Sequence, residues 1–127
     1  MTAKRDGRAP NIVLFLMDDL GWRDLTCYGS SFYETPTLDR LAAQGMRFTE
    51  AYAACPVCSP TRASLLSGKY PATLGTTDYF DWSGKWHPCK GLLVDVPYIR
   101  ELPLTETSLA SALHQHGYQT WHVGKLH

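Results

Sequence analysis

The residues best suited to chemistry gather in one short stretch, Cys58-Ser-Pro-Thr-Arg62. The pattern predicts a helix over 58–67 that begins at this stretch. The first backbone N–H groups of a helix are unpaired and carry partial positive charge, and Arg62, one turn in, adds a full charge. We therefore expect an anion to bind at this helix end, facing a reactive group at Cys58.

Two further pairs of residues carry polar chemistry. Asp18 and Asp19 directly follow an apolar run, and two carboxylates suit Ca²⁺ or Mg²⁺, although a turn cap beside a solvated acid is the alternative. Lys125 and His127 are suited to binding an oxyanion and moving a proton, the alternative being frayed terminal residues. Together with Cys58, these pairs suit attack on a tetrahedral oxyanion ester.

The cysteine spacing permits a different interpretation. Cys55 and Cys58 form a C-x2-C pair, and this spacing is found in zinc sites, with Cys27, Cys89 or a histidine completing the set. A cation such as Arg62 beside the metal disfavours that interpretation. A non-catalytic zinc-binding module stays open as an alternative, and we expect no disulfide in a chain without an export signal.

The composition limits the partners that the chain can have. Twelve basic and twelve acidic residues cancel among 127 residues, of which 44% are hydrophobic. We expect one domain and neither nucleic acid nor a membrane as partner, since the apolar run 12–17 is too short to span a bilayer. The polar residues 1–10 form a flexible lead without a signal peptide. The sequence as written predicts a cytoplasmic location, with a periplasmic or secreted one if the N-terminus is incomplete.

Apolar runs alternate with helical patterns along the chain. The run 12–17 does not alternate with polar residues, which is typical of a strand buried on both faces of a parallel sheet. We expect an α/β fold with a mostly parallel sheet flanked by helices, and ligands bind at the carboxyl ends of such strands. The predicted strands cover 12–17, 46–53 and 118–123, and the predicted helices cover 35–45, 58–67 and 105–116.

Capping residues set the predicted helix bounds. Thr35 caps the helix over 35–45, Pro36 opens it and Gly45 closes it. For the helix over 58–67, the corresponding residues are Ser59, Pro60 and Gly68, and Gly117 stops the helix over 105–116.

Residues 69–104 show no sustained period and are rich in Gly, Pro and aromatic residues. We expect an irregular segment on the side of the active site, because so long a connection is uncommon unless it is functional. Its aromatic residues either stack on a sugar or aryl ring or serve as packing. They are Tyr70, Tyr79, Phe80, Trp82, Trp86 and Tyr98.

Four stretches give the chain a family resemblance: 10–22, 35–52, 58–68 and 117–127. The third matches the pattern C-x-P-x-R and the fourth ends in Gly-Lys-x-His. In this order they resemble the N-terminal part of the type I sulfatases, the arylsulfatase-like, formylglycine-dependent enzymes of the alkaline phosphatase superfamily. The resemblance covers nearly the whole chain and implies an incomplete sheet of that fold, since family members are much longer.

The resemblance implies a mechanism centred on Cys58. A separate formylglycine-generating enzyme would convert it to formylglycine (3-oxoalanine), whose aldehyde hydrates. One hydroxyl would attack the sulfur of a sulfate monoester, carbohydrate or aryl, leaving a covalent sulfo-enzyme, and the second hydroxyl would release sulfate. Arg62 would fix the hydrated aldehyde.

The resemblance also assigns the remaining site residues. Asp18 and Asp19 would bind calcium, or magnesium, together with the modified Cys58. Lys125 would bind the sulfate, and His127 would hydrogen-bond the diol or help its collapse. The family's other metal ligands lie later in its sequences, so we expect this chain alone to be inactive or very weak. A phosphonate or phosphodiester hydrolase of the same superfamily is the alternative activity.

Overall fold

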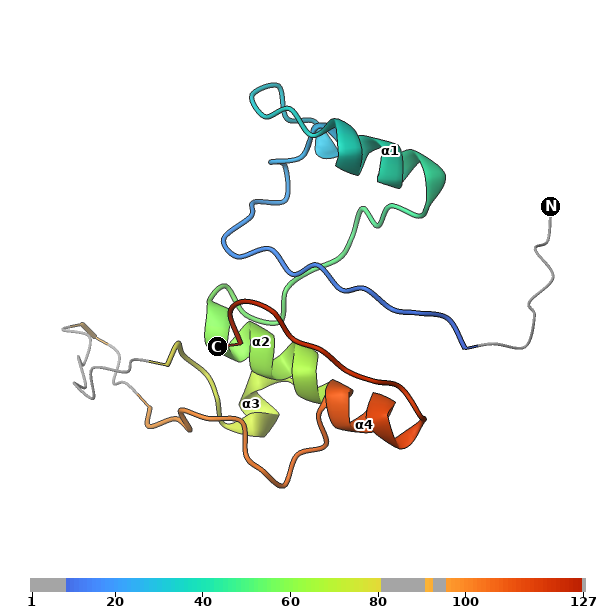
Figure 1. Ribbon diagram of the computed structural model, residues 1–127. Helices are drawn as coiled ribbons and strands as arrows, with labels where there is room; N and C mark the ends of the chain where they lie inside the picture. The colour runs from blue at the N-terminus through green and yellow to red at the C-terminus, as the bar shows by residue number, and fades with distance from the viewer. Residues whose placement is uncertain (1–8, 81–90, 93–95, 127) are drawn as a thin grey trace. The chain divides into compact units, whose positions relative to one another are not determined.

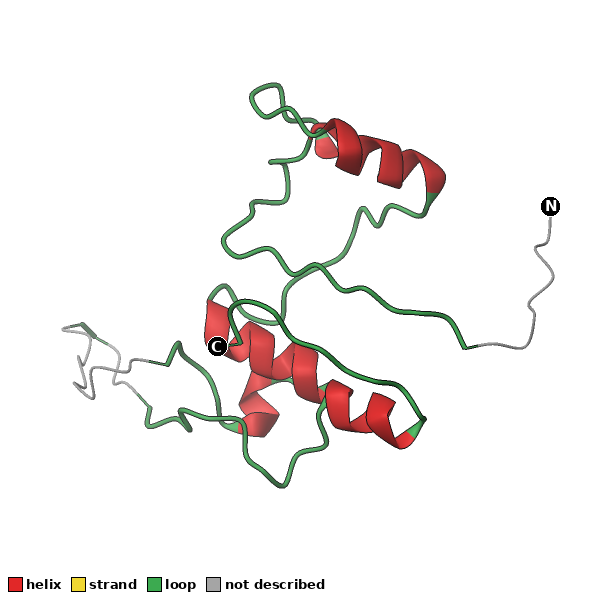
Figure 2. Cartoon of the chain, in the orientation of Figure 1, coloured by secondary structure: helices red, strands yellow, loops and turns green. Residues whose placement is uncertain are grey.

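The computed structural model describes residues 9–80, 91–92 and 96–126, which form helices and loops (Figures 1 and 2). The chain divides into two compact units, Met1–Met46 and Arg47–His127, called here the first and the second unit. No helix in the described ranges is long and apolar enough to cross a membrane.

Hydroxyl groups hold the first unit together. Its elements are the 3-10 helix η1 (Thr26–Tyr28) and the helix α1 (Pro36–Gln44), which pack against each other. The backbone N–H of Thr26 donates to Oγ1 of Thr35 at 2.9 Å, and Thr35 Oγ1 donates to Oδ1 of Asp39 at 3.2 Å. Thr35 occupies the predicted capping position, but its side chain makes no capping hydrogen bond to the helix, because it bonds η1 and Asp39 instead.

The predicted end of α1 is confirmed. The backbone N–H of Gly45 donates to the carbonyl of Leu41 at 2.9 Å, and Gly45 follows the last helical residue. Pro36 is the first helical residue, as predicted. A proline costs nothing there, because the first N–H groups of a helix have no partner within it.

The second unit contains the buried residues. Its helices are α2 (Cys58–Ser67), α3 (Pro71–Leu74) and α4 (Leu109–Gln115), and α2 packs against both others (Figure 1). Ala63 and Leu74 are the buried hydrophobic residues of the described ranges, and Ser59, Arg62 and Thr76 are buried polar ones. Pro60 and Pro71 are buried as well, so polar and apolar side chains share this small core.

The bounds of α2 agree with the sequence, but its predicted cap is wrong. Val57 occupies the capping position, and Ser59 and Pro60 are the second and third helical residues. Pro60 is tolerated because it still lies in the first turn. Gly68 ends the helix with φ of 70°, and its N–H donates to the carbonyl of Ser64 at 2.8 Å.

The helix predicted over 105–116 begins later, at Leu109. The hydroxyl of Ser108 accepts a hydrogen bond from the N–H of Ser111 at 3.1 Å and so defines the start. The preceding residues form a turn instead, in which the N–H of Glu106 donates to the carbonyl of Pro103 at 2.9 Å. The predicted stop at Gly117 is confirmed, with φ of 82°.

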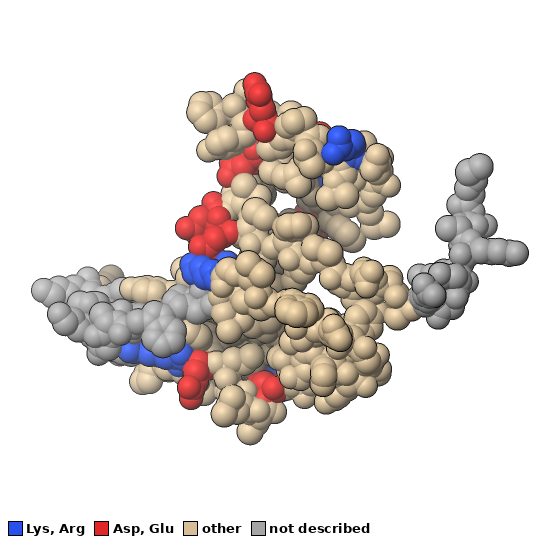
Figure 3. Space-filling model, in the orientation of Figure 1, with Lys and Arg blue, Asp and Glu red and all other residues tan. Residues whose placement is uncertain are grey.

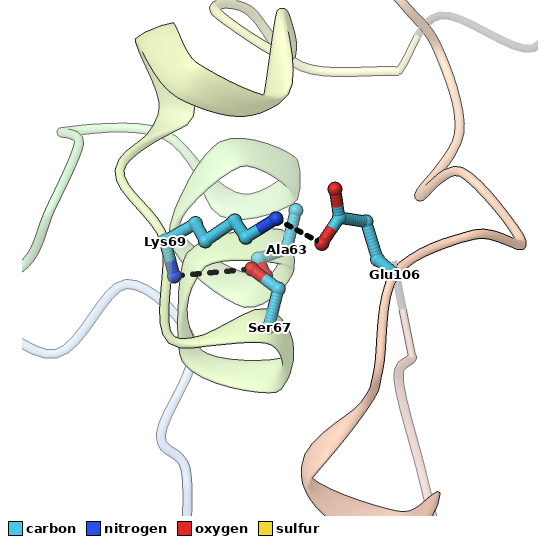
Figure 4. Close-up of polar contacts among 4 residues, drawn as sticks. All are labelled: Ala63, Ser67, Lys69 and Glu106. Atoms are coloured by element: carbon cyan, nitrogen blue, oxygen red, sulfur yellow. Dashed lines mark hydrogen bonds and ion pairs between the residues drawn. The ribbon is translucent and has the colours of Figure 1, made fainter.

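An ion pair joins the end of α2 to the turn before α4 (Figure 4). Nζ of Lys69 lies 2.6 Å from Oε2 of Glu106. Oγ of Ser67 donates to the carbonyl of Ala63 at 2.7 Å and accepts from the N–H of Lys69 at 3.2 Å. Because both charged side chains are partly exposed, the pair contributes at most about 1 kcal/mol.

The three predicted strands are not confirmed in the described residues, where 12–17, 46–53 and 118–123 are loops. Their apolar side chains are exposed, as Phe15 at 78%, Tyr52 at 84% and Val123 at 96% illustrate. A strand forms only when a neighbour supplies its hydrogen bonds, and no described segment does so.

In Figure 3, acidic and basic side chains cover only part of the visible face.

Candidate active site

The first residue of α2 is the predicted nucleophile position. Cys58 is half-buried, and its Sγ lies 3.9 Å from Oγ of Ser59. The backbone N–H groups of the first helical turn have no partner within the helix. Cys58 therefore lies where partial positive charge favours an anion.

Arg62 lies one turn into the same helix and is 8% exposed. Its Nη1 donates a hydrogen bond of 2.6 Å to the backbone carbonyl of Lys125, a residue 63 positions later in the sequence. Such a charge-assisted bond offsets part of the cost of burying the guanidinium. The structure thus brings together two of the predicted site residues, through the main chain of Lys125.

The segment that carries Lys125 is shaped by its neighbours. Gly124 has φ of 100°, a conformation that other residues rarely adopt. Nε2 of His122 lies 3.1 Å from the carbonyl oxygen of Gly124. Lys125 itself is exposed, and His127, the other predicted residue of this segment, lies outside the described residues.

Two hydroxyls of the Cys58–Arg62 stretch have roles that the sequence did not indicate. Ser59 Oγ accepts from the N–H of Phe80 at 2.8 Å, which fastens the irregular segment to the start of α2. Thr61 Oγ1 donates to the carbonyl of Cys55 at 2.6 Å and fixes the turn before the helix. Both residues occupy the unspecified positions of C-x-P-x-R, so the motif itself gave no signal.

The predicted metal ligands Asp18 and Asp19 belong to the first unit and are exposed. Asp19 has φ of 55° and is the one non-glycine residue with positive φ in the described ranges. Asp tolerates this conformation better than most residues, and such backbone positions are frequent at ligand sites. Two adjacent exposed carboxylates have the donor chemistry that a hard divalent cation requires.

A complete metal site is not assembled in the part of the chain that the structure describes. There, no group of three or more His, Cys, Asp or Glu side chains lies close enough to hold an ion. Cys55 and Cys58, the basis of the zinc alternative, are both half-buried thiols without a disulfide. Cys89, another residue considered for that alternative, lies outside the described residues.

Comparison with known proteins gives one family. The model of the Sulfatase family matches residues 10–127. Human arylsulfatase A is 45% identical over 121 residues, which cover 94% of this chain and 21% of that protein. N-acetylgalactosamine-6-sulfatase of Sus scrofa is 42% identical over 118 residues (93% and 22%), and steryl-sulfatase of Rattus norvegicus 39% over 127 residues (100% and 21%). The chain spans about a fifth of the length of these relatives.

Proposed function

This chain belongs to the sulfatase family, and on that premise we propose that it supplies the nucleophile and part of the anion site of a sulfate monoester hydrolase. The hydrogen bond from Arg62 to the carbonyl of Lys125 carries this proposal. It links two cationic residues from distant parts of the sequence beside the helix that begins at Cys58. An attacking group and cationic charge on one short element suit transfer of an anionic group.

Cys58 is the proposed site of modification to formylglycine by a formylglycine-generating enzyme. When formed, that group would supply a hydrated aldehyde as the source of the attacking oxygen. The start of α2 and the Arg62 guanidinium favour negative charge beside residue 58. Lys125 binds the sulfate, and His127 exchanges protons with the reacting hydroxyls.

The carboxylates of Asp18 and Asp19, with the modified residue 58, are the proposed ligands of Ca²⁺ or Mg²⁺. A bound cation would neutralise charge on the sulfate oxygens. The positive φ of Asp19 supports a ligand role, since such a conformation is retained where its surroundings require it.

The finer fold follows the family. Sulfatases have an α/β fold of the alkaline-phosphatase type, and we propose that the apolar segments 12–17, 46–53 and 118–123 are strands of its sheet when partner strands pair with them. Their exposed side chains support this assignment, because apolar surface is stabilised by burial at about 25 cal/mol per Å².

Coexpression with a formylglycine-generating enzyme tests the proposed function. We expect mass spectrometry to find an aldehyde at residue 58 and a thiol at residue 55. The aldehyde should be absent from Cys58→Ala and present in the matched control Cys55→Ala, and any weak hydrolysis of phenyl sulfate in the presence of Ca²⁺ should follow the same pattern. An unmodified thiol at position 58, or equal hydrolysis by Cys58→Ala, would contradict the proposal.

A further inference from the structure

Two parts of the irregular segment, 75–80 and 96–100, are fastened to each other within the second unit. The backbone N–H of Ile99 donates to the carbonyl of Gly75 at 2.7 Å. The phenol of Tyr98 donates to the carbonyl of Tyr79 at 2.6 Å. One main-chain bond and one side-chain bond therefore hold the two parts in a defined register.

This pair of segments is also anchored to α2 beside the nucleophile position. The N–H of Phe80 donates to the buried hydroxyl of Ser59 at 2.8 Å, and that oxygen lies 3.9 Å from Sγ of Cys58. At the other end of the segment, Thr76 is fully buried, and its N–H donates to the carbonyl of Pro71 in α3 at 3.1 Å. Residues 76–80 are thus fixed at both ends.

The fastened segments place an aromatic ring, a cation and a carboxylate together. Cζ of Arg100 lies 5.5 Å from the centroid of the Tyr98 ring. The pKa of Tyr98 is raised above its usual value, chiefly by burial, while Arg100 lowers it and the nearby charge of Asp78 raises it. Oδ1 of Asp78 also accepts from the N–H of Tyr79 at 2.7 Å, and Tyr79 is 47% exposed.

This combination matches the surface of a sugar ring. The exposed face of Tyr79 suits the C–H face of a sugar, while Arg100 donates to hydroxyls and Asp78 accepts from them. A plain aryl ring would cover the two charged groups and offer them no hydrogen bonds, which is costly. A second sulfate would be attracted by Arg100 and repelled by Asp78.

We propose that Asp78, Tyr79, Tyr98 and Arg100 form a carbohydrate subsite next to Cys58, which holds a sugar ring of the ester. The subsite rests on the proposed function for its place in catalysis and deepens it by naming the substrate class. Asp78, Tyr79 and Arg100 contact the sugar, whereas Tyr98 positions the other residues through its bonds to Tyr79 and Arg100.

Binding by the full 127-residue chain tests the subsite. NMR titrations would use an N-acetylhexosamine 6-sulfate, the same sugar without sulfate, and phenyl sulfate. We expect Arg100→Gln and Tyr79→Leu each to weaken binding of both sugars by about tenfold, the loss expected for a charged hydrogen bond or a stacked ring. Binding of phenyl sulfate should change less than about twofold. Tyr79→Leu retains the backbone carbonyl that Tyr98 bonds, so the segment keeps its anchor.

The controls separate the subsite from the chemistry. Arg40→Gln on α1 and Tyr70→Leu outside the cluster should leave sugar binding unchanged. Cys58→Ala should lose the aldehyde at residue 58 and still bind the unsulfated sugar, so failure of the sulfatase proposal would leave this binding intact. The subsite would be overturned if Arg100→Gln weakened the binding of phenyl sulfate as much as the binding of the sugars. It would also be overturned if the unsubstituted chain did not bind the unsulfated sugar.

Discussion

The two units of the chain hold their elements by hydrogen bonds of different reach. In the first unit, the bond from Thr26 to Thr35 spans 9 residues, and none of its described residues is buried. In the second unit, the bonds from Phe80 to Ser59 and from Arg62 to Lys125 span 21 and 63 residues and involve buried side chains. Local bonds suffice to form a helix, but positioning a site requires bonds between distant segments.

The largest expected effect on the difference between the two units is that of replacing Arg62. We expect Arg62→Leu to lower the free energy of unfolding by about 2–3 kcal/mol, because a buried bond to a charged group is lost. Urea titration would measure this. The matched change Arg40→Leu, on the exposed part of α1, should cost less than about 0.5 kcal/mol. Equal losses would mean that the long-range bond adds nothing to stability.

Substitutions of one serine in each unit compare the stability contributed by a long-range and a local hydrogen bond. Ser59→Ala leaves the N–H of Phe80 without its acceptor and should cost about 1–2 kcal/mol in urea titrations. Ser30→Ala removes an acceptor from the N–H groups of Phe32 and Tyr33, at 3.3 and 3.2 Å, in an exposed loop of the first unit. Water replaces that acceptor, so we expect a cost below about 0.5 kcal/mol. A larger cost for Ser30→Ala would reverse the comparison.

The second unit also contains a buried polar group that lowers its stability. Thr76 is fully buried, and its Oγ1 has no hydrogen-bond partner. Thr76→Val keeps the shape and removes the unsatisfied oxygen, so the melting temperature should rise, in line with a gain of up to about 1 kcal/mol. Thr73→Val, at an exposed position of α3, provides the control. A lower melting temperature for Thr76→Val would show that the hydroxyl has a partner in solution.

The smallest expected effect concerns pH. The pKa of Tyr98 is raised in the folded chain, chiefly by burial, so its contribution to stability is complete below its unfolded pKa of about 10 and falls as pH rises above it. Urea titrations at pH 8 and above pH 10 would measure the free energy of unfolding of the unsubstituted chain and of Tyr98→Phe. The difference between the two should be smaller above pH 10 than at pH 8. Tyr33→Phe in the first unit is the control, and an equal decrease there would contradict the assignment to Tyr98.

Short-range signals in the sequence predicted where the helices end, but they did not predict the contacts between distant segments. Gly68 and Gly117 end their helices as expected, because a positive φ is a property of the residue itself. The strands are not confirmed, because pairing depends on neighbours that the pattern of 12–17 does not reveal. Ser59 was interpreted as a cap, whereas its hydroxyl serves a distant amide.

The candidate site shows the same division. Its residue types were readable in advance, since Cys58, Arg62 and Lys125 carry reactive or charged groups. The hydrogen bond from Arg62 to the carbonyl of Lys125 could not be predicted, because every residue has a backbone carbonyl and the sequence does not indicate which one is bound. His127 and the joint metal site of Asp18, Asp19 and Cys58 stay predictions.

The bond from Arg62 to Lys125 separates two properties of residue 125 that a side-chain contact would combine. Since Arg62 binds the main chain, this bond does not depend on the group attached at residue 125. Arginine, an acetylated lysine or a synthetic amine could replace the lysine at the same backbone position. Position 125 is therefore a suitable place to vary charge while the backbone geometry stays constant.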